Sequence, residues 1–362
     1  MLQLERRIGM RLAAVMLFLT LLPTPAGARE RKCETVMWGY VDFQELRENA
    51  KVWHDVKGMD GFIFCYVNGK GPPRWYTGPE MVARIYEELP ETVAGLRKAG
   101  IEANFVHAGV DNKDWHWFNE ELLKKVVPTF RQLAKMANES KCRGVALDCE
   151  AYNSGGTLWN PRGYKEEQLP EVKRRIRQMG ADIAGVILEE FPDAEILLLP
   201  EGAYVAAIGT PDHPQYDLWV EFYHGLESKK PPGGIHIFCS GSYLSTDPLW
   251  LHQLHGRVWG NMLGVADDLI YFKRHCTVNL TAWLQLDQQG PQYLARLDDP
   301  KTLEAVERQF RTMRKLSPHG YAFIFAHVAG LYKIPPDRKG PEQMHGSLAP
   351  NADEYFNILR SR

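Results

Sequence analysis

Eight apolar segments rich in β-branched and aromatic residues recur along the chain, and a helical pattern follows each of them. Consecutive parallel strands are joined through helices, so this alternation is typical of a parallel sheet covered by helices. Eight such repeats predict an α/β fold, a (β/α)8 TIM barrel built as a single domain. The length of 362 residues would suggest two domains by simple division, but barrels of this class often reach it as one domain.

The expected strands cover residues 36–43, 61–67, 101–108, 143–152, 195–200, 234–239, 277–286 and 321–326. The expected helices cover residues 44–56, 79–98, 119–137, 164–191, 216–227, 249–274, 299–316 and 353–359. Pro79 suits the first turn of a helix, and Gly100 suits the residue that ends it. The alternative fold is a doubly wound open sheet. That fold would place a glycine-rich phosphate loop after the first strand, and residues 39–42 (GYVD) do not form one, so we expect no nucleotide cofactor.

The first 28 residues have the pattern of a secretory signal peptide. Arg6, Arg7 and Arg11 precede the apolar run 12–22, and Ala26-Gly27-Ala28 supplies a small-residue cleavage site. The run is too short to span a membrane. We therefore expect a mature barrel over residues 29–362 that is secreted or periplasmic and has no membrane contact after signal cleavage.

The charge and cysteine content exclude some classes of partner. A formal net charge of −2 argues against a nucleic-acid partner. The six cysteines include no CxxC pair, so a zinc site is not expected and one or two disulfides remain open.

The stretch 143–152 carries the most distinctive chemistry of the sequence. Acids at alternate positions after the apolar run 144–147 indicate a strand that delivers both of them to a cleft, because such a run cannot easily bury two carboxylates. Asp148 and Glu150 would point the same way, with Cα atoms about 6.6 Å apart. At that separation the charge of Asp148 would favour the protonated form of Glu150. The competing interpretation is a solvated strand end or an ion pair with a nearby Lys or Arg.

Most of the expected strands end in a polar group. Active sites of (β/α)8 barrels lie at the carboxyl ends of the strands, so we expect these groups to gather at one mouth. Strand ends are also polar simply because they meet water, and the cluster is therefore a hypothesis about function. The expected ends carry Asp42, Tyr66, His107, Asp148 with Glu150, Glu201, Tyr243, Asp287 and His327.

Tryptophan side chains follow several of the same strands. Flat apolar faces beside carboxylates suit sugar rings, whose C–H surfaces stack on aromatic rings while their hydroxyls bind acids. The alternative is ordinary packing, which we expect for Trp219, Trp250 and Trp259 on helices. The candidate sugar-binding tryptophans are Trp75, Trp115, Trp117, Trp159 and Trp283.

The secreted barrel with an Asp-x-Glu ending its fourth strand resembles the TIM-barrel glycoside hydrolases. In residues 143–150 (RGVALDCE) the glycine, the Asp and the Glu match the DGxDxDxE strand of the chitinase-type family. The resemblance implies that Glu150 is the general acid and that Asp148 orients it or a substrate acetamido group. Arg143 and Ala146 stand where that family has acids, so substrate assistance by an N-acetyl group is doubtful.

A second resemblance, to amylase-type barrels, implies different roles. That pattern places an Asp on strand four, a Glu after strand five and an Asp after strand seven, which Asp148, Glu201 and Asp287 match by strand. Asp148 would then be the nucleophile and Glu201 the acid. Glycosidic cleavage needs two carboxyls, at about 5 Å for retention of configuration or roughly 6.5–9.5 Å for inversion. Which carboxylate partners Glu150 stays open.

The sequence therefore predicts an enzyme that cleaves a poly- or oligosaccharide, with a carbohydrate as its partner. One alternative is a barrel that binds sugar without cleaving it. Another is a metal-dependent hydrolase that uses His107, His327 and the acids. The chain has no HxH or HExxH motif, so no catalytic metal is expected. A serine hydrolase is not expected either, because residues 240–242 (SGS) lack the GxSxG spacing.

Overall fold

The computed structural model describes residues 32–68, 70–110, 115–150, 158–199, 218–243, 245–283, 303–326 and 352–361. Residues 32–362 form one compact unit. The expected signal peptide, residues 1–28, lies outside the described residues.

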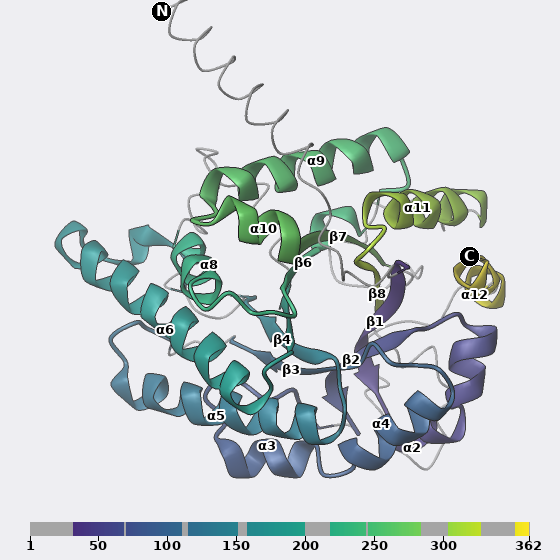
Figure 1. Ribbon diagram of the computed structural model, residues 1–362, viewed down its shortest axis with the longest axis horizontal. Helices are drawn as coiled ribbons and strands as arrows, with labels where there is room; N and C mark the ends of the chain where they lie inside the picture. The colour runs from purple at the N-terminus through teal and green to yellow at the C-terminus, as the bar shows by residue number, and fades with distance from the viewer. Residues whose placement is uncertain are drawn as a thin grey trace, which may run out of the picture. The chain divides into compact units, whose positions relative to one another are not determined.

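Eight parallel strands close into a barrel in sequence order, with β1 paired to both β2 and β8. Helices lie around the outside of this barrel (Figure 1). The predicted (β/α)8 architecture is therefore confirmed. The strands are β1 (Glu34–Val41), β2 (Gly61–Val67), β3 (Phe105–Gly109), β4 (Gly144–Asp148), β5 (Glu195–Leu199), β6 (Ile235–Cys239), β7 (Cys276–Trp283) and β8 (Tyr321–Ala326).

The helices follow the expected order and differ mainly where one expected helix is two. They are α2 (Phe43–Glu48), α3 (Pro79–Ile85), α4 (Leu89–Lys98), α5 (Glu120–Glu139), α6 (Leu169–Glu190), α8 (Trp219–Glu227), α9 (Pro248–Val265), α10 (Leu269–His275), α11 (Leu303–Leu316) and α12 (Ala352–Arg360). A π-helical turn, Val52–Val56, follows α2.

The helix expected over residues 79–98 is interrupted at Tyr86. Pro90 in the first turn of α4 has no N–H to continue a helix from α3. The Tyr86 hydroxyl instead bonds to the Phe64 carbonyl on β2, at 2.8 Å, and to the His107 backbone on β3, at 3.0 Å. The β2–β3 ladder pairs only Ile63 with Phe105 and Phe64 with Val106. Tyr86 therefore joins the two strands beyond the point where their own pairing ends.

The helix expected over residues 249–274 is also two helices. Asp268 caps α10 by accepting from the backbone N–H groups of Ile270 and Tyr271. A side chain that satisfies these free N–H groups favours a new helix start, and the chain therefore turns between α9 and α10.

The barrel interior is filled by its own apolar cluster, separate from the larger core between the strands and the helices. The close approach of β4 and β5 depends on Gly144, the glycine of the strand-four motif. A Cβ at that position would lie 1.9 Å from the Glu195 carbonyl oxygen, a separation no side chain tolerates. The interior cluster consists of Val36, Trp38, Ile63, Cys65, Ala103, Phe105, Ala146, Leu197, Leu199, Phe238, Tyr321 and Phe323.

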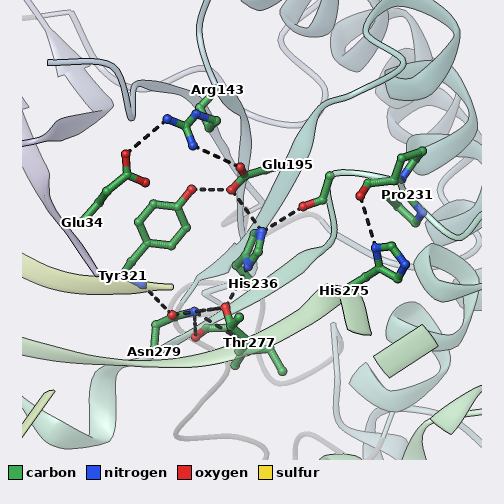
Figure 2. A network of polar contacts seen from close by, with 12 residues as sticks. Glu34, Arg143, Glu195, Pro231, His236, His275, Thr277, Asn279 and Tyr321 are labelled. Carbon is green, nitrogen blue, oxygen red and sulfur yellow. Dashed lines mark hydrogen bonds and ion pairs between the residues drawn. The ribbon is translucent and has the colours of Figure 1, made fainter. Parts of the chain in front are cut away.

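A polar network closes the amino end of the barrel (Figure 2). Glu195, the first residue of β5, contacts Arg143 at 3.4 Å, His236 at 3.1 Å and the Tyr321 hydroxyl. Arg143 also pairs with Glu34 at 3.2 Å. His236 continues the network to the hydroxyl of Thr277 at 2.8 Å. Charged groups with this little exposure need partners, and here each described charge has one or more.

The cysteines of the barrel are thiols in buried surroundings. Burial raises the pKa of Cys239 and of Cys276 to about 12, and it raises the pKa of Cys142 further. These groups stay protonated and unreactive at neutral pH. No disulfide joins any of Cys65, Cys142, Cys239 and Cys276. Among the described residues, no helix combines the length and apolar character that a membrane span requires.

Candidate active site

Strand β4 delivers Asp148 to the carboxyl-terminal mouth of the barrel. The backbone N–H of Glu150 donates to Asp148 Oδ1 at 2.9 Å. The chain stays between its neighbours beyond the end of β4, because Val110 N donates to Asp148 O and Cys149 N donates to Leu199 O. Asp148 is 9% exposed and Glu150 is partly exposed. Of the two acids, Glu150 is therefore the one with access to a ligand.

His107 on β3 lies against the second oxygen of Asp148. The distance from His107 Nε2 to Asp148 Oδ2 is 3.3 Å, within ion-pair range, although the contact lacks the alignment of a hydrogen bond. The imidazole is fully buried. Its backbone is held by the Tyr86 hydroxyl. Both oxygens of Asp148 thus have neighbours that fix the orientation of the carboxylate.

Gly109, the last residue of β3, leaves room at the mouth for two charged groups. A Cβ at this position would lie 3.2 Å from Asp148 Oδ2 and 3.4 Å from Arg74 Nη1. Gly109 pairs with Asp148 across the β3–β4 ladder and with Arg74 in an isolated bridge. The absent side chain therefore leaves space for both the Arg74 guanidinium and the Asp148 carboxylate at the end of β3.

The thiol of Cys65 on β2 lies close enough to these charges for them to change its pKa. Burial and the charge of Asp148 raise its pKa well above the ordinary value, and Glu150 acts in the same direction. Arg74 acts in the opposite direction. Because Cys65 belongs to the cluster inside the barrel, Asp148, Glu150 and Arg74 all act on the barrel interior. The inward orientation of the acidic pair stays a prediction.

An aromatic surface lies on the other side of the same mouth. Phe325 of β8 stacks on Tyr243 at 5.4 Å and meets Trp283 edge-on at 4.9 Å. Trp38 of β1 connects this surface to His107, with ring centroids 4.8 Å from Phe325 and 6.1 Å from His107. Tyr243 and Phe325 are partly exposed. Their exposed area is apolar surface that a ligand at the mouth can contact.

Ser242 fixes the position of the neighbouring Tyr243. Its hydroxyl donates to the Thr281 carbonyl at 2.8 Å and accepts from the Thr281 N–H at 2.7 Å. It is completely buried. Ser242 is therefore a structural residue that attaches Tyr243 to β7.

Four of the tryptophans expected to stack on sugar are packed behind the strands instead. Trp75, Trp115, Trp117 and Trp159 are at most 1% exposed. They form one aromatic cluster, with ring centroids 5.5 to 5.9 Å apart between successive members. No face of these rings is open to a ligand, which does not agree with their expected role. Of the helical tryptophans expected to pack, Trp219 is buried and Trp259 packs against the core, but Trp250 is 39% exposed, so that part of the prediction is wrong.

The remaining candidate site residues lie in three places: in the barrel, at a helix cap and in segments outside the described residues. Tyr66 packs against the cluster inside the barrel. Asp42 caps α2 by accepting from the Glu45 N–H at 2.9 Å. Glu201, Asp287 and His327 lie outside the described residues.

Sequence reasoning missed Arg74, Trp38 and Phe325. Arg74 lies in a polar loop, and only its pairing with Gly109 places it at the mouth. The alternation of inward and outward residues along β1 and β8 was the available signal for Trp38 and Phe325. Within the described ranges, no group of three His, Cys, Asp or Glu side chains is arranged to hold a metal ion.

The fold and this placement define the class: a (β/α)8 barrel whose candidate site lies at the carboxyl ends of its strands. No protein-family model matches the chain, and no curated protein matches its sequence. The chain is similar in structure to an exo-beta-1,4-mannosidase from Opitutaceae bacterium strain TAV5, with a TM-score of 0.51 and 12% identity over 94% of this chain and 62% of the other.

Two further solved structures are similar to this chain. A trimodular endoglucanase gives a TM-score of 0.50 at 10% identity, covering 91% of this chain and 60% of that one. A xylanase from Paenibacillus barcinonensis gives 0.48 at 12% identity, covering 95% and 100%. The chain spans about 60% of the mannosidase and endoglucanase chains. It therefore has the barrel fold found in TIM-barrel glycoside hydrolases, whereas the local chitinase-type likeness of residues 143–150 stays a prediction.

Proposed function

We propose that this chain is a secreted or periplasmic glycoside hydrolase that cleaves a poly- or oligosaccharide by carboxylate acid/base catalysis. The observation that carries the proposal is the placement of Asp148 and Glu150. Asp148 accepts from the Glu150 N–H on one oxygen and lies 3.3 Å from His107 on the other, and Glu150 is partly exposed at the mouth of a closed barrel. The barrel fold shared with a mannosidase and an endoglucanase is consistent with this function but does not establish it.

In the proposed reaction Glu150 donates its proton to the glycosidic oxygen as the bond to the anomeric carbon breaks. Water supplies the hydroxyl of the new reducing end, and a second carboxylate either removes the proton of that water or forms the glycosyl intermediate. The two contacts of Asp148 suit a residue that orients Glu150. Glu201 and Asp287 are then the candidates for the second carboxylate.

The aromatic surface supplies the other requirement of sugar binding. Partly exposed Tyr243 and Phe325 offer apolar area across the mouth from the acids. A pyranose ring placed between them and Glu150 can stack its C–H face and still expose its glycosidic oxygen to the acid.

The test is purified Glu150→Gln assayed for release of reducing ends over a glycan panel. We expect a loss of roughly 100- to 10,000-fold in kcat on any glycan that the wild type cleaves, because the amide cannot donate the required proton. Binding of the same glycan, measured by calorimetry, should persist.

The matched control is Glu102→Gln, an exposed acid before β3 that should leave the rate unchanged. Full activity of Glu150→Gln would remove the proposal. A wild type that binds a glycan and releases no product would favour the alternative, a barrel that binds carbohydrate without cleaving it.

A further inference from the structure

The position of Arg74 is fixed by backbone contacts on both sides. The Gly109 N–H donates to the Pro73 carbonyl at 2.9 Å, and the Trp75 N–H donates to the Gly109 carbonyl at 3.0 Å. The Arg74 N–H donates to the Thr77 hydroxyl at 2.6 Å. Residues 73–75 thus continue the sheet beside the end of β3, and the loop cannot move without breaking these bonds.

Trp75 determines which way Arg74 points. Its indole is completely buried in the aromatic cluster behind the strands, and its Nε1 donates to the Ala108 carbonyl at 3.1 Å. Successive residues of an extended segment point to opposite sides. The Arg74 side chain therefore faces the barrel mouth, where its Nη1 would lie 3.4 Å from a Gly109 Cβ.

The guanidinium of Arg74 makes no hydrogen bond or ion pair with any residue that the structure describes. The Asp148 carboxylate, whose Oδ2 would also lie close to a Gly109 Cβ, instead accepts from the Glu150 N–H and lies 3.3 Å from His107 Nε2. Arg47 on α2 differs in this respect, because it pairs with Glu88 at 2.7 Å. A partly exposed arginine on an anchored backbone, whose five N–H donors bond to no described residue, can bind a planar anion.

We propose that Arg74 binds the carboxylate of an acidic sugar, so that the substrate is a glycan containing hexuronate residues. This inference rests on the proposed function and names its substrate class. The fork of the guanidinium matches the two oxygens of a carboxylate, and its positive charge offsets the repulsion that Asp148 and Glu150 exert on an anionic ring. A neutral glycan would leave this cation without a partner in the bound complex.

The experiment uses pairs of polymers that differ only in whether their sugars carry a carboxyl group. Polyuronides such as pectate, alginate and glucuronoxylan are compared with the same polymers after chemical reduction of their carboxyls to alcohols. We expect the full-length wild type to cleave at least one polyuronide with a kcat/KM at least 10-fold above that for its reduced form. In Arg74→Met this preference should fall roughly 10- to 100-fold.

Arg74→Lys keeps the charge and removes the fork, so we expect it to retain an intermediate preference. Arg84→Met, an exposed arginine on α3, is the matched control and should keep the wild-type preference. Thermal melting of each variant verifies that it is folded.

Several outcomes would overturn the inference and leave the proposed function standing. These are a wild type that prefers the reduced polymers, one that prefers sulfated neutral glycans, and an Arg74→Met variant that keeps the wild-type preference. A wild type that neither binds nor cleaves any glycan would overturn both proposals.

Discussion

The two ends of the barrel use the same residue types in different ways. At the amino end, Glu195 shares its two oxygens among three side chains, and the described charges of that network are paired (Figure 2). At the carboxyl end, Asp148 is held by two contacts, but the neighbouring Arg74 guanidinium pairs with no described residue. The buried His107 Nδ1 atom likewise has no hydrogen-bond partner among the described residues.

This difference separates polar groups that hold the fold from polar groups that await a ligand. A network whose members satisfy one another contributes to stability and has no donor left for substrate. A site retains bonding capacity because its partner arrives from solution. In (β/α)8 barrels these two duties fall on opposite ends of the strands, and the contacts of Glu195 and Arg74 follow that division.

The largest expected effect tests the amino end. Glu195→Ala should lower the free energy of unfolding by about 3 kcal/mol, because it leaves Arg143, His236 and Tyr321 without their shared acceptor. The kcat of the remaining folded protein should be unchanged. Urea unfolding measures the first quantity and an assay below the melting temperature measures the second. If Glu195→Ala instead kept normal stability and lost activity, the functional site would lie at the amino end, and the proposed placement at the carboxyl end would be wrong.

The converse change at the carboxyl end should alter activity more than stability. Asp148→Asn keeps an oxygen for the Glu150 N–H, so we expect the free energy of unfolding to change by about 1 kcal/mol or less. The kcat should fall roughly 100-fold with a much smaller change in KM, because the carboxylate that orients Glu150 is lost. Comparable losses of stability in Asp148→Asn and Glu195→Ala would contradict the division between the ends.

The smallest effect concerns Glu45, a partly buried acid that belongs neither to the network at the amino end nor to the candidate site at the carboxyl end. Burial raises the pKa of Glu45 on α2 to about 7, although the hydrogen bond from the Trp53 indole lowers it in part. Its folded pKa exceeds its unfolded value, so its contribution to stability is complete below about pH 4.5 and is lost as the pH rises through about 7. After allowance for solvent screening this loss is about 1 kcal/mol.

Glu45→Gln should therefore match the wild type in thermal stability at pH 4 and exceed it at pH 8. Melting curves across that range measure the difference. Glu48→Gln, an exposed acid on the same helix, should show no such dependence. An identical pH slope in Glu45→Gln and in the wild type would show that Glu45 ionises normally.

The sequence predicted the fold well because its signals were local and repeated. The strands β2 and β8 have the predicted bounds residue for residue, since glycine or polar residues delimit their apolar runs. The break at Tyr86 was missed because its cause is tertiary. The hydroxyl satisfies backbone groups on two strands, and that contact cannot be recognised from helical periodicity.

The site was predicted in part for the same reason. His107, Asp148 and Glu150 end expected strands, and the parallel topology brings strand ends together. The loops after the strands have no sequence pattern that shows which of their side chains face the mouth. Trp75 and Arg74 are adjacent in one loop, yet the tryptophan packs in the core and the arginine faces the mouth. Residue type alone favoured Trp75 as the residue at the mouth and gave no reason to place Arg74 there.

The aromatic cluster behind β3 and β4 has a spectroscopic consequence. Indole emission shifts to longer wavelength on contact with water, and Trp53, Trp75, Trp115, Trp117, Trp159 and Trp219 are all buried in the folded chain. Their fluorescence will follow unfolding of the whole barrel and will respond little to a bound glycan. Trp283 lies beside Tyr243 and Phe325 and is 9% exposed, so it is suited to act as an intrinsic optical probe of ligand binding.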